Sequence, residues 1–202
     1  MRALELVTVL AAMVVFAASE PSRAAPEPSP ALPSLVKPFL LPAKGLGTVG
    51  DWAALDANKA ATWGQGPTMQ AKPSPDGNYF VRPGRGQTDG RPLDVLATGA
   101  RSGVFSVYIR DPGGAADAGA TAAAFRKAGY SVTVARCPID PAAPATARRW
   151  LRLTAPGKRP AFLSAGPLAS GGAGYILFLA DDELPALTPK EAGMYTDSCG
   201  KL

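Results

Sequence analysis

Between residues 103 and 137, the apolar and polar positions follow a strand, turn, helix, strand pattern. Residues 104–110 alternate with a period of two, which is typical of a half-buried strand. Residues 111–114 (Asp-Pro-Gly-Gly) end this strand, because proline has no N–H for a sheet and glycine frees the backbone to turn. The alanine-rich residues 115–128 favour a helix, and alternation resumes over residues 130–135. We therefore predict a βαβ unit whose two strands run parallel.

The same reasoning predicts further strands on both sides of this unit. Residues 78–82 and 93–98 each follow a turn containing Asp-Gly, so we expect a β-hairpin or two edge strands there. Residues 149–154 alternate, and residues 161–164 form a short strand after a Pro-Gly turn. Residues 175–180 are a continuous apolar run, which indicates a central strand buried on both faces.

Two short helices are expected outside the βαβ unit. Residues 51–63 place Trp52 and Trp63 at helical spacing behind Asp51, a suitable N-cap. We interpret the two tryptophans as core anchors and not as a ligand platform. Residues 188–191 (Thr-Pro-Lys-Glu) form a capping box with proline at the first helical position, so a C-terminal helix begins there.

Taken together, these elements predict one α+β domain over residues 46–202. We expect a mixed, mostly antiparallel sheet of about four to six strands with a βαβ unit and a short C-terminal helix.

Part of this predicted domain is similar to the SPOR peptidoglycan-binding fold. The shared features lie in residues 105–153: an alternating strand, a helix ending in Lys-Ala-Gly-Tyr (127–130), and a later Trp-Leu-Arg-Leu strand (150–153). This similarity implies a peptidoglycan-binding domain as an alternative interpretation.

The N-terminus predicts export. Arg2 provides a positive end, residues 6–18 are an uncharged, almost wholly apolar run, and small residues precede Ala25, so residues 1–24 read as a secretory signal peptide. Whether the signal is cleaved or kept as an anchor is left open at this point. We expect a periplasmic or secreted protein.

A proline-rich lead follows over residues 25–45. Its prolines favour an extended polyproline II chain and disfavour helix and sheet. The second half of the lead is apolar, and we expect it to lie across the folded body rather than on a partner. Its apolar residues are Leu35, Val36, Phe39, Leu40 and Leu41.

The composition excludes several kinds of chemistry. The chain contains no histidine, which removes the commonest general base, metal ligand and haem ligand. Histidine-assisted serine and cysteine hydrolases are excluded for the same reason. We expect no metal and no cofactor. Catalysis by carboxylates, lysine or tyrosine is left open, although a protein that is not an enzyme is favoured.

Cys137 and Cys199 are the only cysteines. An exported protein meets an oxidising compartment, so the two are expected to form one structural disulfide. Their spacing does not fit a CxxC redox motif, and two thiolates without histidine make a poor metal site.

The charge is polarised toward one basic segment. The net charge is +5, and residues 141–180 contain no acidic residue. Strand alternation would place Trp150 and Arg152 on one face of the strand and Leu151 and Leu153 on the other. We predict a site here for an anionic, partly planar or sugar-bearing ligand. Its candidate residues are Arg148, Trp150, Arg152, Lys158 and Arg159.

An alternative assigns these cations to internal pairing with Asp181, Asp182 and Glu183, with Trp150 packed under a loop. Between a ligand site and internal pairing, the sequence favours pairing.

The first functional hypothesis is an exported, non-enzymatic bacterial envelope protein that acts as a binding or accessory module, with an envelope polyanion or a protein as its partner. No membrane contact is expected beyond the signal segment. The alternatives are the SPOR-like domain and a histidine-independent enzyme that acts on the cell wall through carboxylates. Nucleic-acid binding suits the basic charge but not the signal peptide. The sequence leaves the oligomeric state open.

Overall fold

The computed structural model describes residues 32–40, 52–57, 59–69, 80–88, 90–115, 117–179, 184 and 186–199. The strands are β1 (Ala61–Trp63), β2 (Thr68–Met69), β3 (Phe80–Thr88), β4 (Arg91–Ala100), β5 (Gly103–Asp111), β6 (Ser131–Pro138), β7 (Arg149–Thr154), β8 (Ala161–Pro167), β9 (Ala173–Phe178) and β10 (Tyr195–Thr196). The helices are α1 (Leu32–Val36), the 3-10 helix η1 (Lys37–Phe39), α2 (Ala53–Ala57), α3 (Ala118–Lys127) and α4 (Pro189–Ala192). None of these described helices is long and apolar enough to cross a membrane.

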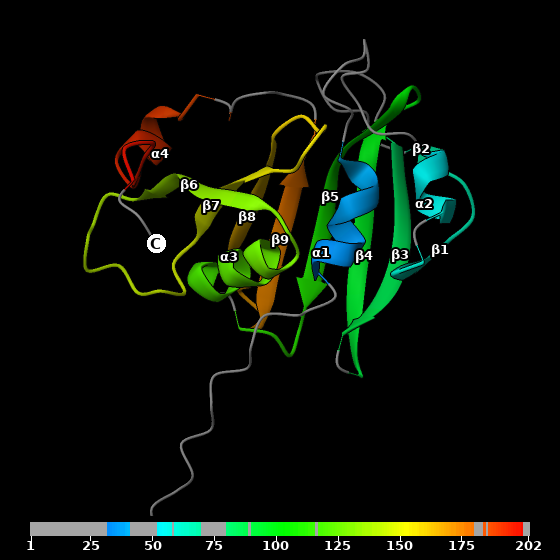
Figure 1. The fold of residues 1–202 in the computed structure, drawn as a ribbon, viewed down its shortest axis with the longest axis horizontal. Coiled ribbons are helices and arrows are strands. Elements are labelled where there is room, and N and C mark those ends of the chain that lie inside the picture. The colour runs from blue at the N-terminus through cyan, green and yellow to red at the C-terminus, as the bar shows by residue number, and fades with distance from the viewer. Residues whose placement is uncertain are drawn as a thin grey trace, which may run out of the picture.

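All ten described strands belong to one sheet. Its order is β1-β3-β4-β5-β9-β8-β7-β6-β10, with β2 also paired to β3. Each described pairing is antiparallel. The predicted fold class, an α+β domain of four to six strands, is therefore wrong. The protein is a mostly antiparallel β-sheet structure with short helices (Figure 1).

The predicted βαβ unit explains part of the error. Its strand, helix and strand exist as β5, α3 and β6, but β5 and β6 are not neighbours. After β6 the chain folds back through two antiparallel pairings, β6–β7 and β7–β8, and β9 enters the sheet between β8 and β5. A period of two reports which face of a strand is buried but not which strand lies beside it.

The core lies on the side of the sheet that carries the helices. Figure 1 shows α1 in front of β4 and β5, and α3 in front of the strands from β7 to β9. Side chains from both helices meet the inward side chains of the sheet in one hydrophobic cluster. The large, fully buried members are Tyr175, Phe39, Phe125, Leu32, Leu35, Leu55, Leu93, Ile109, Leu151, Leu153, Leu163 and Leu177.

The described part of the proline-rich lead is helical, which corrects the extended chain predicted there. Leu32–Val36 is an α-helix and Lys37–Phe39 continues as a 3-10 helix. Pro33 and Pro38 lie near the starts of these helices, where proline is tolerated because the first N–H groups have no intrahelical partner. Leu35, Val36, Phe39 and Leu40 are buried in the core, so this apolar segment lies on the folded body as expected.

The helix predicted over residues 51–63 is also corrected. Only Ala53–Ala57 is helical, and Ala61–Trp63 is a strand paired with residues 84–86 of β3. A helix this short is marginal by itself, and pairing with β3 satisfies the backbone of the second half. Trp52 and Trp63 both pack against the core, as expected of core anchors, and Trp63 also lines a surface groove.

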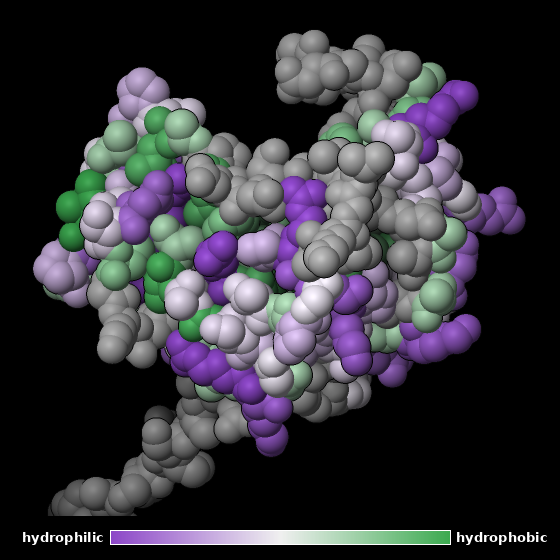
Figure 2. Space-filling model, turned by 45° about the horizontal axis from the view of Figure 1, so that its top comes forward, coloured by the Kyte–Doolittle hydropathy of each residue, from purple (hydrophilic) through white to green (hydrophobic). Residues whose placement is uncertain are grey.

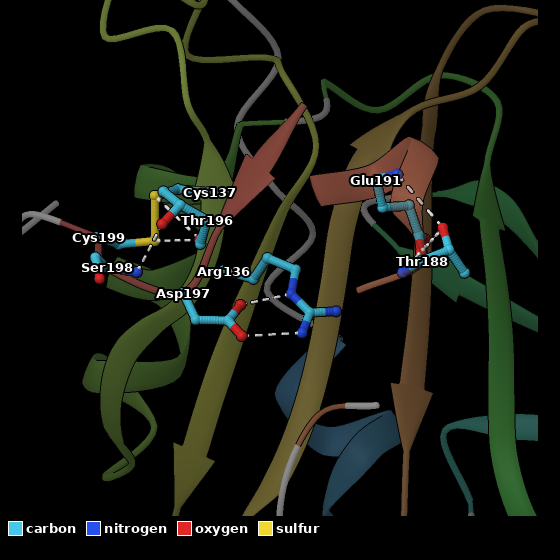
Figure 3. Close-up of polar contacts among 8 residues, drawn as sticks. All are labelled: Arg136, Cys137, Thr188, Glu191, Thr196, Asp197, Ser198 and Cys199. Carbon is cyan, nitrogen blue, oxygen red and sulfur yellow. Dashed lines mark hydrogen bonds and ion pairs between the residues drawn. A yellow bond between two sulfur atoms is a disulfide. The ribbon is translucent and has the colours of Figure 1, made fainter. Parts of the chain in front are cut away.

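The remaining predicted strands and the C-terminal helix are confirmed, most of them with shifted bounds. The hairpin is β3–β4, and residues 175–178 of the apolar run lie in β9, between β5 and β8 near the middle of the sheet. The Thr188 side chain caps Glu191 N and the Glu191 side chain accepts from Thr188 N, so the predicted capping box is present (Figure 3). Hydrogen bonds from Thr188 hold the pKa of Glu191 below its ordinary value of 4.5.

Candidate functional site

One face of the sheet points away from the helices, and we call it the outer face. Cross-strand pairing places one row of residues across it: Leu96, Tyr108, Ile176, Ser164 and Trp150. Successive side chains of a strand point to opposite faces, so the preceding or following residues face the core. These core-facing neighbours are Val95, Ile109, Tyr175, Leu163 and Leu151, each at most 3 % exposed. This face is open to solvent around Arg85, Asp94 and Arg110 on β3, β4 and β5, whereas Ser164 on β8 is buried.

Arginine dominates the charge of the outer face. Arg85, Asp94 and Arg110 are consecutive cross-strand partners in the row beside Leu96 and Tyr108, and all three are exposed. Arg152 is exposed on the same face of β7. Asp94 is the single acidic residue among the described strand residues of this face. The face is therefore positively charged.

A shallow groove of about 800 Å³ crosses the outer face over β1, β3, β4 and β5. Its apolar lining includes Pro83, Leu96 and Tyr108, which are consecutive cross-strand partners. Its charged lining residues are Arg85, Asp94 and Arg110. An apolar strip and a charged strip thus run side by side through the groove.

The charged residues of the groove do not form ion pairs with one another. Directly opposed residues of an antiparallel pair are close enough for ion pairs. Within the described part of the chain, however, Asp94 forms no salt bridge with Arg85 or Arg110. Arg110 Nη2 donates a hydrogen bond of 3.4 Å to Ser170 Oγ. The groove therefore presents two guanidinium groups and one carboxylate to solvent.

The structure brings three of the five residues of the predicted basic site together. Leu151 and Leu153 face the core, and Trp150 and Arg152 share the outer face, as strand alternation predicted. Arg148 lies over Gly166 on this face, where its Nη1 donates to Ser164 Oγ at 2.7 Å and its Nη2 to Pro167 O at 3.4 Å. Arg152 is thus exposed, whereas Arg148 is held against the sheet.

The other two predicted residues lie at the far end of this strand. Lys158 follows a turn closed by its N–H to Ala155 O at 3.1 Å, in which Gly157 has a φ of 68°. Lys158 and Arg159 are both half-buried. The acidic residues proposed to neutralise the basic segment, Asp181 to Glu183, lie outside the described residues.

The C-terminal segment, residues 186–199, is fixed to the edge of the sheet beside Trp150. The predicted disulfide between Cys137 and Cys199 is present, with the Cα atoms 5.8 Å apart (Figure 3). Arg136 donates to both oxygens of Asp197, at 2.6 and 3.1 Å, and these bonds hold the pKa of Asp197 below its ordinary value of 3.8.

Trp150 itself is packed within this edge. Its ring meets the ring of Tyr195 edge to face, with the centroids 4.9 Å apart, and the Arg136 guanidinium lies 5.8 Å from its centroid. The indole is half-buried, so only part of it is available to a ligand.

A small apolar surface lies at the same edge. Figure 2 shows hydrophobic residues gathered on the side of α4 and β6. Ile139 and Met194 are about half exposed there, and Ile139 N donates to Met194 O at 2.9 Å. Nothing in the described structure indicates what covers this surface.

The sequence reasoning missed the groove. Alternation over residues 104–110 already placed Tyr108 and Arg110 on one face of a strand. The contributions of Arg85 and Asp94 follow only from the register of β3, β4 and β5. No group of three or more His, Cys, Asp or Glu side chains suited to a metal ion occurs within the described ranges.

Comparison with known proteins gives no relative from which a function could be transferred. No family model matches the chain, and neither a curated protein nor a solved structure is significantly similar to it. The similarity of residues 105–153 to the SPOR fold therefore has no family-level match behind it.

Proposed function

We propose that this protein is a non-enzymatic, extracytoplasmic binding module that holds an anionic ligand against the outer face of its sheet. The observation that carries this proposal is the excess of arginine there: Arg85, Arg110, Arg148 and Arg152 against Asp94. Guanidinium groups pair with carboxylates and phosphates in a planar, two-pronged geometry. A positively charged face also raises the association rate of anions.

The disulfide supports the proposed location. Disulfides persist in oxidising compartments and are rare in the cytosol, so the Cys137–Cys199 bond is compatible with export. The signal peptide predicted over residues 1–24 lies outside the described residues and is part of the proposal.

The carboxylate-based enzyme receives no support from the groove. Glycoside hydrolysis uses two carboxyl groups about 5–10 Å apart on either side of the scissile bond. Asp94 is the one carboxylate among the described lining residues of the groove. Binding is therefore the function that this geometry supports best.

The proposal is tested by titrating the disulfide-bonded protein with polyphosphate, polyglutamate and polygalacturonate. We expect at least one of these polyanions to bind with an affinity that falls as salt is added. The double variant Arg110→Ala, Arg152→Ala should weaken this binding by about tenfold or more, because two charges are removed from the contact surface. Its fold should be intact, since exposed charges contribute about 0–1 kcal/mol to stability.

A matched control removes the same total charge elsewhere. The double variant Lys127→Ala, Lys190→Ala changes exposed cations on α3 and α4. It should bind nearly as well as the unmodified protein. Absence of binding to all three polyanions, or equal losses in the two double variants, would refute a specific anionic site on the outer face.

A further inference from the structure

The apolar strip of the groove offers a broad, shallow surface. Pro83, Leu96 and Tyr108 lie side by side on three neighbouring strands, and Leu96 and Tyr108 are half-buried. A Cβ built on Gly174 would lie 3.7 Å from the Tyr108 hydroxyl oxygen, so the phenol reaches diagonally across the sheet toward β9. A ligand that uses this surface therefore needs an apolar side of its own.

The charged strip runs parallel to the apolar one. Arg85, Asp94 and Arg110 precede or follow the apolar residues by two positions along each strand, which separates the strips by about 7 Å. A ligand of modest width can therefore contact both strips at once. Its polar edge would then meet a carboxylate flanked by two guanidinium groups.

The position of Asp94 discriminates between anionic ligands. An ionised carboxylate only accepts hydrogen bonds, so it requires donors on the ligand. A phosphate chain or an acidic peptide side chain that bridges Arg85 and Arg110 would bring negative charge against Asp94, which is unfavourable. The favoured ligand has an anionic group for an arginine and hydroxyl groups that donate to Asp94.

A peptide bound as an added strand fits the groove less well. Strand addition uses the free N–H and C=O groups of a sheet edge. The groove lies on a face of the sheet, and the backbones of β3, β4 and β5 are already paired there. Recognition must therefore come from side chains.

Resting on the function proposed above, we propose that this groove binds an acidic saccharide. The apolar side of a sugar ring lies on Leu96 and Tyr108, its hydroxyl groups donate to Asp94, and its carboxylate accepts from Arg85 or Arg110. Each of the three features of the groove is then satisfied by one ligand class.

The test compares three ligands that separate these features, each titrated calorimetrically into the disulfide-bonded protein. An oligogalacturonate of four to six sugars carries both carboxylates and hydroxyl groups. Its methyl ester keeps the hydroxyl groups without the charge, and hexaglutamate keeps the charge without the hydroxyl groups. We expect the oligogalacturonate to bind about tenfold or more tighter than either control, since hydrogen bonds to charged groups are lost in each case.

Two substitutions locate the effect in the groove. Asp94→Asn should weaken oligogalacturonate binding but strengthen hexaglutamate binding, because the hydrogen-bond acceptor becomes weaker and the repulsion is removed. Tyr108→Ala should weaken oligogalacturonate binding, whereas Tyr108→Phe, which keeps the ring, should not. Arg152→Ala is the comparison outside the groove and should leave the ratio between the affinities for oligogalacturonate and hexaglutamate unchanged.

The outcomes separate this inference from the proposed function. Equal binding of hexaglutamate and oligogalacturonate that is lost in the Arg110→Ala, Arg152→Ala variant would overturn the saccharide proposal and leave the anionic site standing. The saccharide proposal is also overturned, with the anionic site left standing, if Asp94→Asn raises or lowers the affinities for oligogalacturonate and hexaglutamate together. If polyphosphate, polyglutamate and polygalacturonate all failed to bind, both the saccharide proposal and the proposed anionic site would be overturned.

Discussion

Tyr175 is a polar side chain placed deep in the core. It lies in β9 and is 1 % exposed, and its hydroxyl has no hydrogen-bond partner among the described residues. Burial raises the pKa of Tyr175 from 10.0 to about 12 and outweighs the opposing effect of the neighbouring Thr121 hydroxyl. The Thr121 hydroxyl donates its own proton to Asp117 O at 2.7 Å. The phenol is thus held neutral inside the protein.

Replacing Tyr175 by Phe tests this account. At neutral pH the free energy of unfolding should rise by about 1–3 kcal/mol, because Phe removes a buried hydroxyl whose desolvation is not offset by a hydrogen bond. As the pH rises from 10 toward 12, the unfolded chain releases the phenol proton while the folded chain keeps it. This contribution to stability is present below pH 10 and is lost as the pH approaches the folded-state pKa.

For a pKa raised by two units, the free energy of unfolding falls by roughly 2–3 kcal/mol over this pH range. The Tyr175→Phe variant has no phenol proton to lose and should not show this fall. Urea denaturation of both proteins between pH 8 and pH 12 measures the difference. Parallel stability profiles over this range would show that Tyr175 titrates normally.

Side-chain direction could be predicted from the sequence at this scale, but side-chain partners could not. The period of two correctly placed Leu151 toward the core and Arg152 toward the outer face. The bond from Arg148 to Ser164, and the packing of Trp150 on Tyr195, join residues distant in sequence. These contacts depend on the register of β7 with β8 and on the position of β10, which no local pattern specifies.

The helix α3 is the element whose limits are most clearly set by its sequence. Asp117 precedes it with extended backbone and accepts a hydrogen bond of 2.8 Å from Ala120 N, which satisfies one free donor of the first turn. Gly129 follows it with a φ of 90°, a conformation that favours glycine. The alanine pattern predicted a longer helix, because propensity does not identify the residue that caps it.

Removing the N-cap should destabilise the protein without unfolding it. Asp117→Ala should lower the free energy of unfolding by about 0.5–2 kcal/mol, since Ala120 N loses its acceptor. Asp117→Asn keeps a capping oxygen and serves as the control, with a much smaller loss expected. Chemical denaturation at pH 7 compares them, and equal losses in both variants would show that the capping bond is not the cause.

Element identity was easier to predict than element pairing. The segments β5, α3 and β6 were each recognised, yet their arrangement was wrong because three antiparallel strands separate β5 from β6. In residues 51–63 the type of element was also wrong. The spacing of apolar residues predicted a helix throughout, but residues 61–63 form a strand that pairs with β3. In both cases a contact distant in sequence decided the outcome.

At the scale of the whole molecule, the groove and the disulfide lie at opposite ends of the sheet. The groove lies over β1, β3, β4 and β5, whereas the disulfide and the C-terminal segment lie at the other end, on β6 and β10. Three strands, β9, β8 and β7, separate them. We therefore expect the disulfide to stabilise the molecule without forming part of the proposed ligand site in the groove.

The double variant Cys137→Ser, Cys199→Ser tests this separation. The disulfide closes a loop with a sequence separation of 62 residues. The chain-entropy model then gives a loss of about 4 kcal/mol in the free energy of unfolding. Amide hydrogen exchange should increase most in the C-terminal segment and β6, because β10 contributes only two residues to the sheet once the covalent link is gone.

Tyr195→Ala provides the matched comparison, since it removes the contact with Trp150 while keeping the disulfide. It should increase exchange at the C-terminal segment but cost much less stability than the cysteine double variant. Oligogalacturonate or polyanion binding at the groove should be the same in both variants under conditions where they remain folded. If the cysteine variant alone lost both stability and groove binding, the disulfide at β6 would set the register of the sheet as far as β3. This is possible because strand pairing transmits a shift of one strand to its neighbours.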